Sequence, residues 1–67
     1  MEDKRKICEL LLPALQATRA LSDLDSITYH PGIERVTARF RSGHCKSINV
    51  EGDSGITMIF DIVSQLI

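Results

Sequence analysis

The chain lacks tryptophan and is poor in other aromatic residues and in cysteine: its 67 residues include one tyrosine, two phenylalanines and two cysteines. So few rings leave little material for the stacking platforms with which sheet-based proteins bind single-stranded nucleic acid. Two cysteines form at most one bridge, which excludes a disulfide scaffold. The longest apolar run, residues 10–15, is far shorter than the roughly 20 residues of a membrane span. Because the net charge is only −1, the molecule as a whole has no strong attraction for nucleic acid or an anionic membrane.

The first residues of the chain argue against secretion. Met1 to Lys6 carry charges of both signs, and Glu9 interrupts the apolar run that a signal peptide would need. We therefore expect a cytoplasmic protein in which Cys8 and Cys45 stay reduced.

What the chain does contain is the composition of one small globular domain over residues 1–67, with 43% hydrophobic and 25% charged residues. A domain of this size buries only about 60% of its surface on folding. Such a thin core leaves no room for a large active-site cavity, and it favours self-association as a source of extra stability.

The first third of the chain has the period of an amphipathic helix. Over residues 3–21 the apolar positions recur three and four apart: Ile7, Leu10, Leu11, Ala14, Ala17 and Leu21. Pro13 interrupts this pattern, because proline lacks the N–H that would bond to the carbonyl of Glu9 and its ring crowds that turn. The sequence predicts either a kink at Pro13 or a helix start near Leu12, and a helix end at residues 22–25.

Three stretches of alternating polarity follow, which predict three strands at residues 26–30, 35–41 and 45–51. In the first hairpin, pairing Tyr29 with Val36 leaves a four-residue loop from Pro31 to Glu34. In the second hairpin, Val36 must lie opposite Val50 if each face of the sheet is to be uniformly polar or apolar. This pairing leaves a loop over residues 42–44.

A second helix is predicted from Asp53 to Ile67, with Asp53 or Ser54 as its N-cap. Its apolar stripe consists of Ile56, Ile59, Phe60, Val63, Leu66 and Ile67. The predicted fold class is therefore α+β: a helix, a three-stranded antiparallel β-meander and a helix (αβββα), with both helices on one face of the sheet.

Short motifs that look catalytic or metal-binding have simpler explanations. The run Gly52-Asp53-Ser54-Gly55 resembles the nucleophile motif of trypsin-like serine proteases, but Ile56 stands where that family has glycine, and helix capping explains the run. The cysteines and histidines lack the close spacing of zinc ligands, and no acid–base carboxylate pair or glycine-rich phosphate loop is present. We expect no enzyme activity, no cofactor, no metal and no small-molecule substrate.

The predicted order of elements is similar to that of the double-stranded RNA-binding domain, which has nearly this length. In that family a Gly-Pro-x-His loop enters the minor groove and a lysine cluster at the second helix binds phosphates. Here the turn reads His30-Pro31-Gly32-Ile33, and the second helix opens with Glu51, Asp53 and Ser54. Acidic groups there would repel phosphates, so no RNA-contacting residue is transferred and the likeness is one of architecture.

The two helices carry more apolar residues than one buried face needs. Met58 and Ile62 widen the apolar sector of the second helix to about 200°, where roughly 100° suffices, and Leu12 widens that of the first. We therefore predict a non-catalytic module that forms a homodimer or docks another protein through Leu12, Met58 and Ile62. On this hypothesis Ile62→Asp raises the monomer fraction without unfolding the domain. In the alternative, the two helices bury all of the surplus and the protein is a monomer.

A second hypothesis rests on local charge. Residues 33–46 carry a net charge of +3, from Arg35, Arg39, Arg41 and Lys46 against Glu34. On the outer face of the sheet Arg35, Arg39 and Arg41 could follow a nucleic-acid backbone, which makes weak nucleic-acid binding the alternative function. The competing interpretation is a solvated face on which Arg35 pairs with Glu51.

Overall fold

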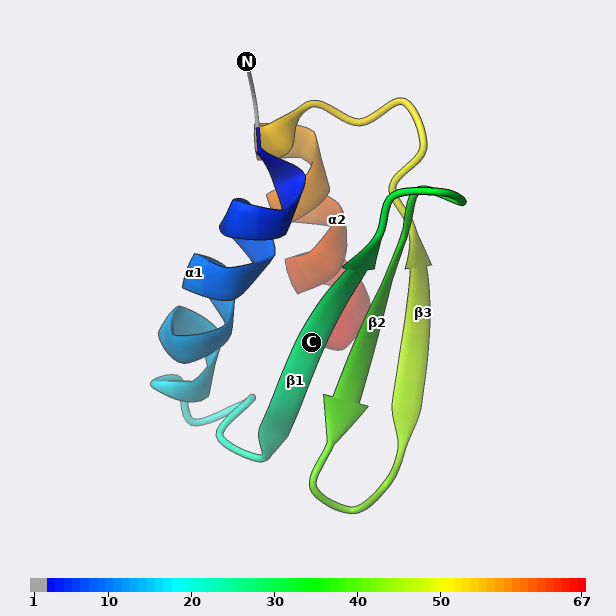
Figure 1. Cartoon of the computed structure of the whole chain (residues 1–67). Helices are drawn as coiled ribbons and strands as arrows, with labels where there is room; N and C mark the ends of the chain where they lie inside the picture. Colours follow the sequence, from blue (N-terminus) through cyan, green and yellow to red (C-terminus); the bar gives the residue numbers. More distant parts are fainter. Residues whose placement is uncertain (1–2) are drawn as a thin grey trace.

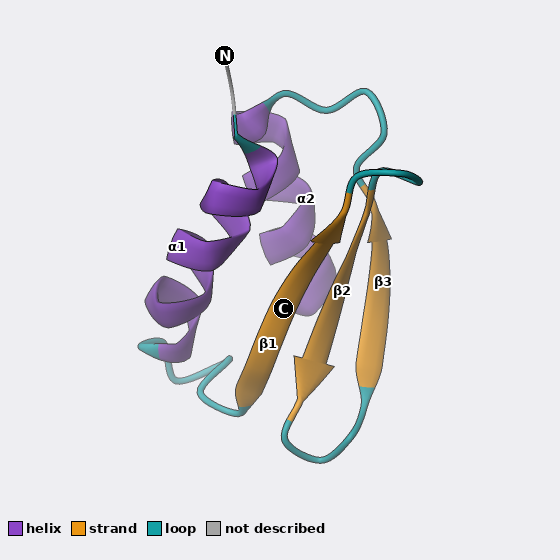
Figure 2. Ribbon diagram, viewed as in Figure 1, coloured by secondary structure: helices purple, strands orange, loops and turns teal. Residues whose placement is uncertain are grey.

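The structure is a computed structural model that describes residues 3–67 (Figure 1). In chain order its elements are α1 (Lys4–Gln16), β1 (Leu24–His30), β2 (Arg35–Phe40), β3 (Cys45–Asn49) and α2 (Gly55–Leu66). The strands form one antiparallel sheet in the order β1-β2-β3, and the two helices run in the same direction beside it (Figure 2). The predicted αβββα fold is confirmed.

Helix α1 begins well before Pro13, so the alternative of a helix start near Leu12 is wrong. The Asp3 carboxylate caps the helix by accepting a hydrogen bond from the Lys6 N–H (3.1 Å), and Pro13 lies inside the helix. The helix ends at Gln16, earlier than the apolar period predicts. The Thr18 hydroxyl causes this end: it donates to the Leu15 carbonyl (2.6 Å) and accepts from a later N–H, offering the backbone local bonds that compete with the helix.

The first hairpin has the predicted register. Tyr29 lies opposite Val36, and the loop runs from Pro31 to Glu34. Strand β1 begins at Leu24, two residues earlier than predicted, and a bulge separates Leu24 from the rest of the ladder.

The predicted register of the second hairpin is wrong by two residues: Val36 lies opposite Ile48, not Val50. The loop does have three residues, but they are Arg41 to Gly43, since the Phe40 N–H donates to the carbonyl of residue 44 at 2.8 Å. A three-residue hairpin loop needs a left-handed residue at its last position, and Gly43 has φ of 93°. The predicted loop would have placed a histidine there. Because the shift is by two residues, every side chain keeps its face.

The core lies between the inner face of the sheet and both helices. Its buried apolar residues form one cluster: Cys8, Leu15, Leu21, Leu24, Val36, Ala38, Ile48, Val50, Met58, Ile62 and Leu66.

Helix α2 is capped by Ser54, one of the two residues predicted for this role. The Ser54 Oγ accepts a hydrogen bond from the Thr57 N–H at 3.2 Å.

Candidate interaction surfaces

Two of the three predicted interface residues are in the core. Met58 and Ile62 are both 0% exposed, and Leu12 is half-buried and packs against the same core. The prediction that Met58 and Ile62 form an exposed surface is therefore wrong. The apolar residues of α2 form two adjacent arcs, one through Met58 and Ile62 and the other through Ile56 and Phe60. The helical period alone does not decide which arc faces the sheet. The short connection after β3, closed by the Asp53 N–H bond to the Val50 carbonyl (3.1 Å), fixes the rotation with which the helix begins.

The other apolar arc faces solvent. Ile56, Phe60 and Ile67 are 77%, 69% and 77% exposed, and their spacing of four and seven places them on one side of α2. On α1, Leu10 is 63% exposed. We call these four residues, Leu10, Ile56, Phe60 and Ile67, the helix patch.

Polar contacts at the outer flanks of the helices show where the helix patch lies. The side-chain amide of Gln16 donates to the Leu24 carbonyl at 2.8 Å, which sets one flank of α1 over the free edge of β1. Asp61 and Gln65 set one flank of α2 beside β3. At 100° per residue, the patch residues lie about 100–180° around their helices from these polar contacts, and their exposure shows that they are turned away from the sheet. The four residues therefore lie on the outer side of the helix layer.

The exposure of the patch does not come from loose packing. The described chain has an accessible surface of 4401 Å², and a compact protein of this mass has about 4,200 Å². The four patch residues together expose on the order of 500 Å², as much as the largest apolar patch of a typical monomer, and such patches are often functional.

The arginines of the second hypothesis lie on the opposite side of the molecule. Arg35 and Arg39 project from the outer face of β2, and Arg41 is in the loop after it. Arg35 lies opposite Asn49 rather than Glu51 and donates to the Ser47 hydroxyl at 3.0 Å. Tyr29 and Phe40 pack against the core and give this face no stacking platform. Nucleic-acid binding by Arg35, Arg39 and Arg41 stays a prediction.

Metal ligands do not gather anywhere in residues 3–67: no group of three or more histidine, cysteine or acidic side chains could hold an ion there. Both cysteines are free, Cys8 in the core and Cys45 on the surface. Burial raises the pKa of the Cys8 thiol. No helix in the same residues is long and apolar enough to cross a membrane.

Asp53, just before α2, and Asp61, in the middle of that helix, are two carboxyl groups that interact. Asp53 and Asp61 are within hydrogen-bonding reach, a bond that requires a proton on one of them. This bond, partial burial and repulsion from the Asp61 charge raise the pKa of Asp53, while Lys4, which pairs with Glu34 at 3.3 Å, opposes the shift. Asp53 Oδ2 is shielded from solvent without a hydrogen-bond partner.

This pair makes stability depend on pH. Because the folded chain holds the Asp53 proton more tightly than the unfolded chain, the stabilisation is complete below the unfolded pKa and is lost as pH rises through the raised folded value. Asp53→Asn keeps a hydrogen bond to Asp61 without the second charge. We expect the variant to be more stable than the wild type at pH 7 and no more stable at pH 3. Urea unfolding at pH 7 and at pH 3 measures this difference in stability, and the exposed substitution Asp25→Asn is the control. An equal gain in stability at both pH values would contradict the expectation.

Comparisons of the chain with protein-family models, curated proteins and solved structures find no match.

Proposed function

We propose that the protein is a non-catalytic self-association module whose helix patch packs against the helix patch of a second copy. The observation that carries this proposal is the exposure of four large apolar side chains, 63–77% each, on one side of a chain of 67 residues. Burying them removes apolar surface from water, at roughly 25 cal/mol per Å².

The size of the patch suits an isologous dimer. A standard interface takes about 800 Å² from each partner. The helix patch offers on the order of 500 Å², and the half-buried residues Ile7, Ile59 and Val63 extend it on both helices. A second copy then covers the patch without further elements.

The patch is also complementary to itself in shape. Its α2 side presents the bulky residues Ile56, Phe60 and Ile67, and its α1 side has exposed Ala14 and Ala17 next to Leu10. A two-fold axis running along the helices sets α1 of one copy against α2 of the other, so that large side chains meet small ones.

The charges around the patch agree with this pairing. With the helices parallel, Lys6 in the first turn of α1 comes near Glu51, just before the start of α2, in the second copy. Basic groups meet acidic groups on both sides of the axis, which favours the same register.

Phe60→Asp is expected to dissociate this dimer. A charge in the centre of an apolar interface costs several kcal/mol, so the dissociation constant of the dimer should rise at least about 100-fold. The domain stays folded because Phe60 is exposed in the single copy. Sedimentation equilibrium over a concentration series measures the constant. Thr57→Asp, on the polar side of the same helix, should leave it within a few-fold of wild type. A wild-type protein that is monomeric at every concentration would overturn self-association.

A further inference from the structure

The free edge of β3 is a second surface without a partner. Within residues 3–67, β3 pairs only with β2. The His44 carbonyl and the Val50 N–H bond to the β2 side of the hairpin, at 2.8 and 3.1 Å. Successive residues of an antiparallel strand turn their backbone groups to opposite sides, so Cys45, Ser47 and Asn49 direct their N–H and C=O groups away from β2. All three residues are exposed.

The other edge of the sheet is protected. At the β1 edge the Gln16 side chain occupies the Leu24 carbonyl at 2.8 Å, and a bulge at Asp25 interrupts the ladder. Bulges and covering groups are the usual means of blocking an edge strand. β3 has a regular register along its whole length and contains no proline, so its edge is open to a further strand.

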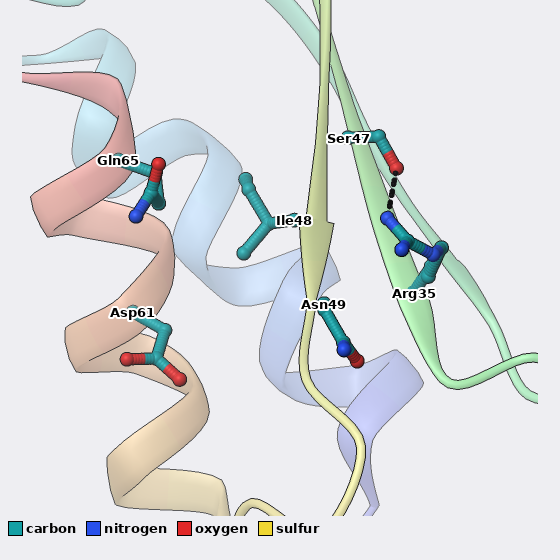
Figure 3. Close-up of a pocket in the computed structure, with 6 residues that line it drawn as sticks. All are labelled: Arg35, Ser47, Ile48, Asn49, Asp61 and Gln65. Atoms are coloured by element: carbon teal, nitrogen blue, oxygen red, sulfur yellow. Dashed lines mark hydrogen bonds between the residues drawn. The ribbon is translucent and has the colours of Figure 1, made fainter.

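A pocket of about 340 Å³ lies along this open edge, between β3 and α2. Its lining consists of Arg35, Ser47, Ile48, Asn49, Asp61 and Gln65. Figure 3 shows Asp61 and Gln65 on α2, Ile48 reaching from β3 towards that helix, and Arg35, Ser47 and Asn49 on the other side of the strand. The helix side of the edge therefore has the Asp61 carboxylate, with the Lys46 ammonium bonded to the Gln65 carbonyl one turn further along α2 (2.8 Å), and the outer side has the Arg35 guanidinium.

We infer that this edge binds an extended peptide of another protein as a fourth strand, with a basic side chain beside Asp61 and an acidic side chain beside Arg35. Neighbouring residues of a strand point to opposite faces, so one basic-acidic pair of adjacent residues meets both charges. The peptide backbone bonds to the free groups of Cys45, Ser47 and Asn49, as in other cases of strand addition.

Charge argues against a second copy at this edge. A two-fold pairing of β3 with β3 would place the two α2 helices side by side, with the flanks that carry Asp61 facing each other. Each flank would then bring one Asp61 carboxylate towards the other, while the Lys46 ammonium of each copy is held one turn further along α2, where it donates to the Gln65 carbonyl at 2.8 Å. This surface is separate from the helix patch, so the inference does not depend on self-association.

Two seven-residue peptides of identical composition test the inference. In Thr-Val-Thr-Lys-Glu-Val-Thr, acetylated and amidated at its ends, adjacent lysine and glutamate reach the two faces; in the control, Thr-Val-Thr-Glu-Lys-Val-Thr, they are exchanged. NMR titration of the labelled full chain should show shift changes at the amides of Cys45, Ser47 and Asn49, and about tenfold weaker binding of the control. Asp61→Asn should reduce this discrimination, and Asp25→Asn at the opposite edge should not.

Methylation of the peptide nitrogens separates strand addition from attraction between charges. In a bound strand only alternate N–H groups face β3. Methylating one alternate set should abolish binding, and methylating the other should leave it unchanged. Equal loss with both sets, or equal binding of the two charge orders, overturns the inference. Slow hydrogen exchange at the three β3 amides in the peptide-free protein, if it is lost when the protein is diluted, also overturns the inference. Such protection would mean that a second copy occupies the edge.

Discussion

Ile62→Asp is expected to unfold the domain at neutral pH. Ile62 is 0% exposed and lies in the cluster that joins α2 to the sheet. An ionised carboxylate without a partner in such a site costs several kcal/mol or more, and a chain of this length has only about 3–10 kcal/mol of stability to lose. Circular dichroism and the dispersion of amide proton signals would both show the loss of structure.

The contrast with nearby positions of α2 makes this result specific. Phe60→Asp and Ser64→Asp place the same group on exposed positions of the same helix, and both variants should keep the wild-type spectrum. If Ile62→Asp instead stayed folded and became monomeric, the two apolar arcs of α2 would have to exchange roles. Ile56 and Phe60 would then face the sheet.

The rotation of the helices is the part of the fold that the sequence could not predict. On α2 the apolar residues cover so wide an arc that the stripe through Ile56 and Phe60 fits the helical period as well as the one through Met58 and Ile62. The choice depends on the loop that delivers the helix and on which side chains fit over Val36. Both are tertiary properties, and a one-dimensional period does not contain them.

The two hairpins differ in how far local turn chemistry determines their register. The loop from Pro31 to Glu34 followed from matching faces and from the preference of proline for the second position of a turn, and the structure has this loop. In the second hairpin the same matching left a choice between registers two residues apart. The need for a left-handed last loop residue, met by Gly43, would have selected the observed register from sequence.

The candidate peptide site depended on that register and was not predicted. With Val36 opposite Ile48, Arg35 bonds to Ser47 at the rim of β3. The predicted register would have paired Arg35 with Glu51 and neutralised it. The approach of Asp61 to the same strand depends on the rotation of α2. Of this site, the sequence predicted only that the sheet has no fourth strand.

Pro13→Ala is expected to stabilise the domain by about 2 kcal/mol. Pro13 is exposed inside α1 and is not part of the core. Proline is roughly 3 kcal/mol less favourable than alanine in a helix interior. Alanine supplies the missing N–H to the Glu9 carbonyl and removes the crowding of the ring, and the greater freedom of the unfolded chain takes back about 1 kcal/mol. The midpoint of thermal unfolding should rise by about 10 °C for a domain of this size.

Pro31→Ala is the matched control, because the same substitution should have the opposite sign in a turn. Pro31 opens the loop between β1 and β2, where its fixed φ suits the conformation and no helical N–H is missing. Its removal only frees the unfolded chain, so Pro31→Ala should lose about 0.4–1 kcal/mol. A loss of stability in both variants would contradict the account of α1, since it would mean that the helix requires the ring of Pro13 for its shape.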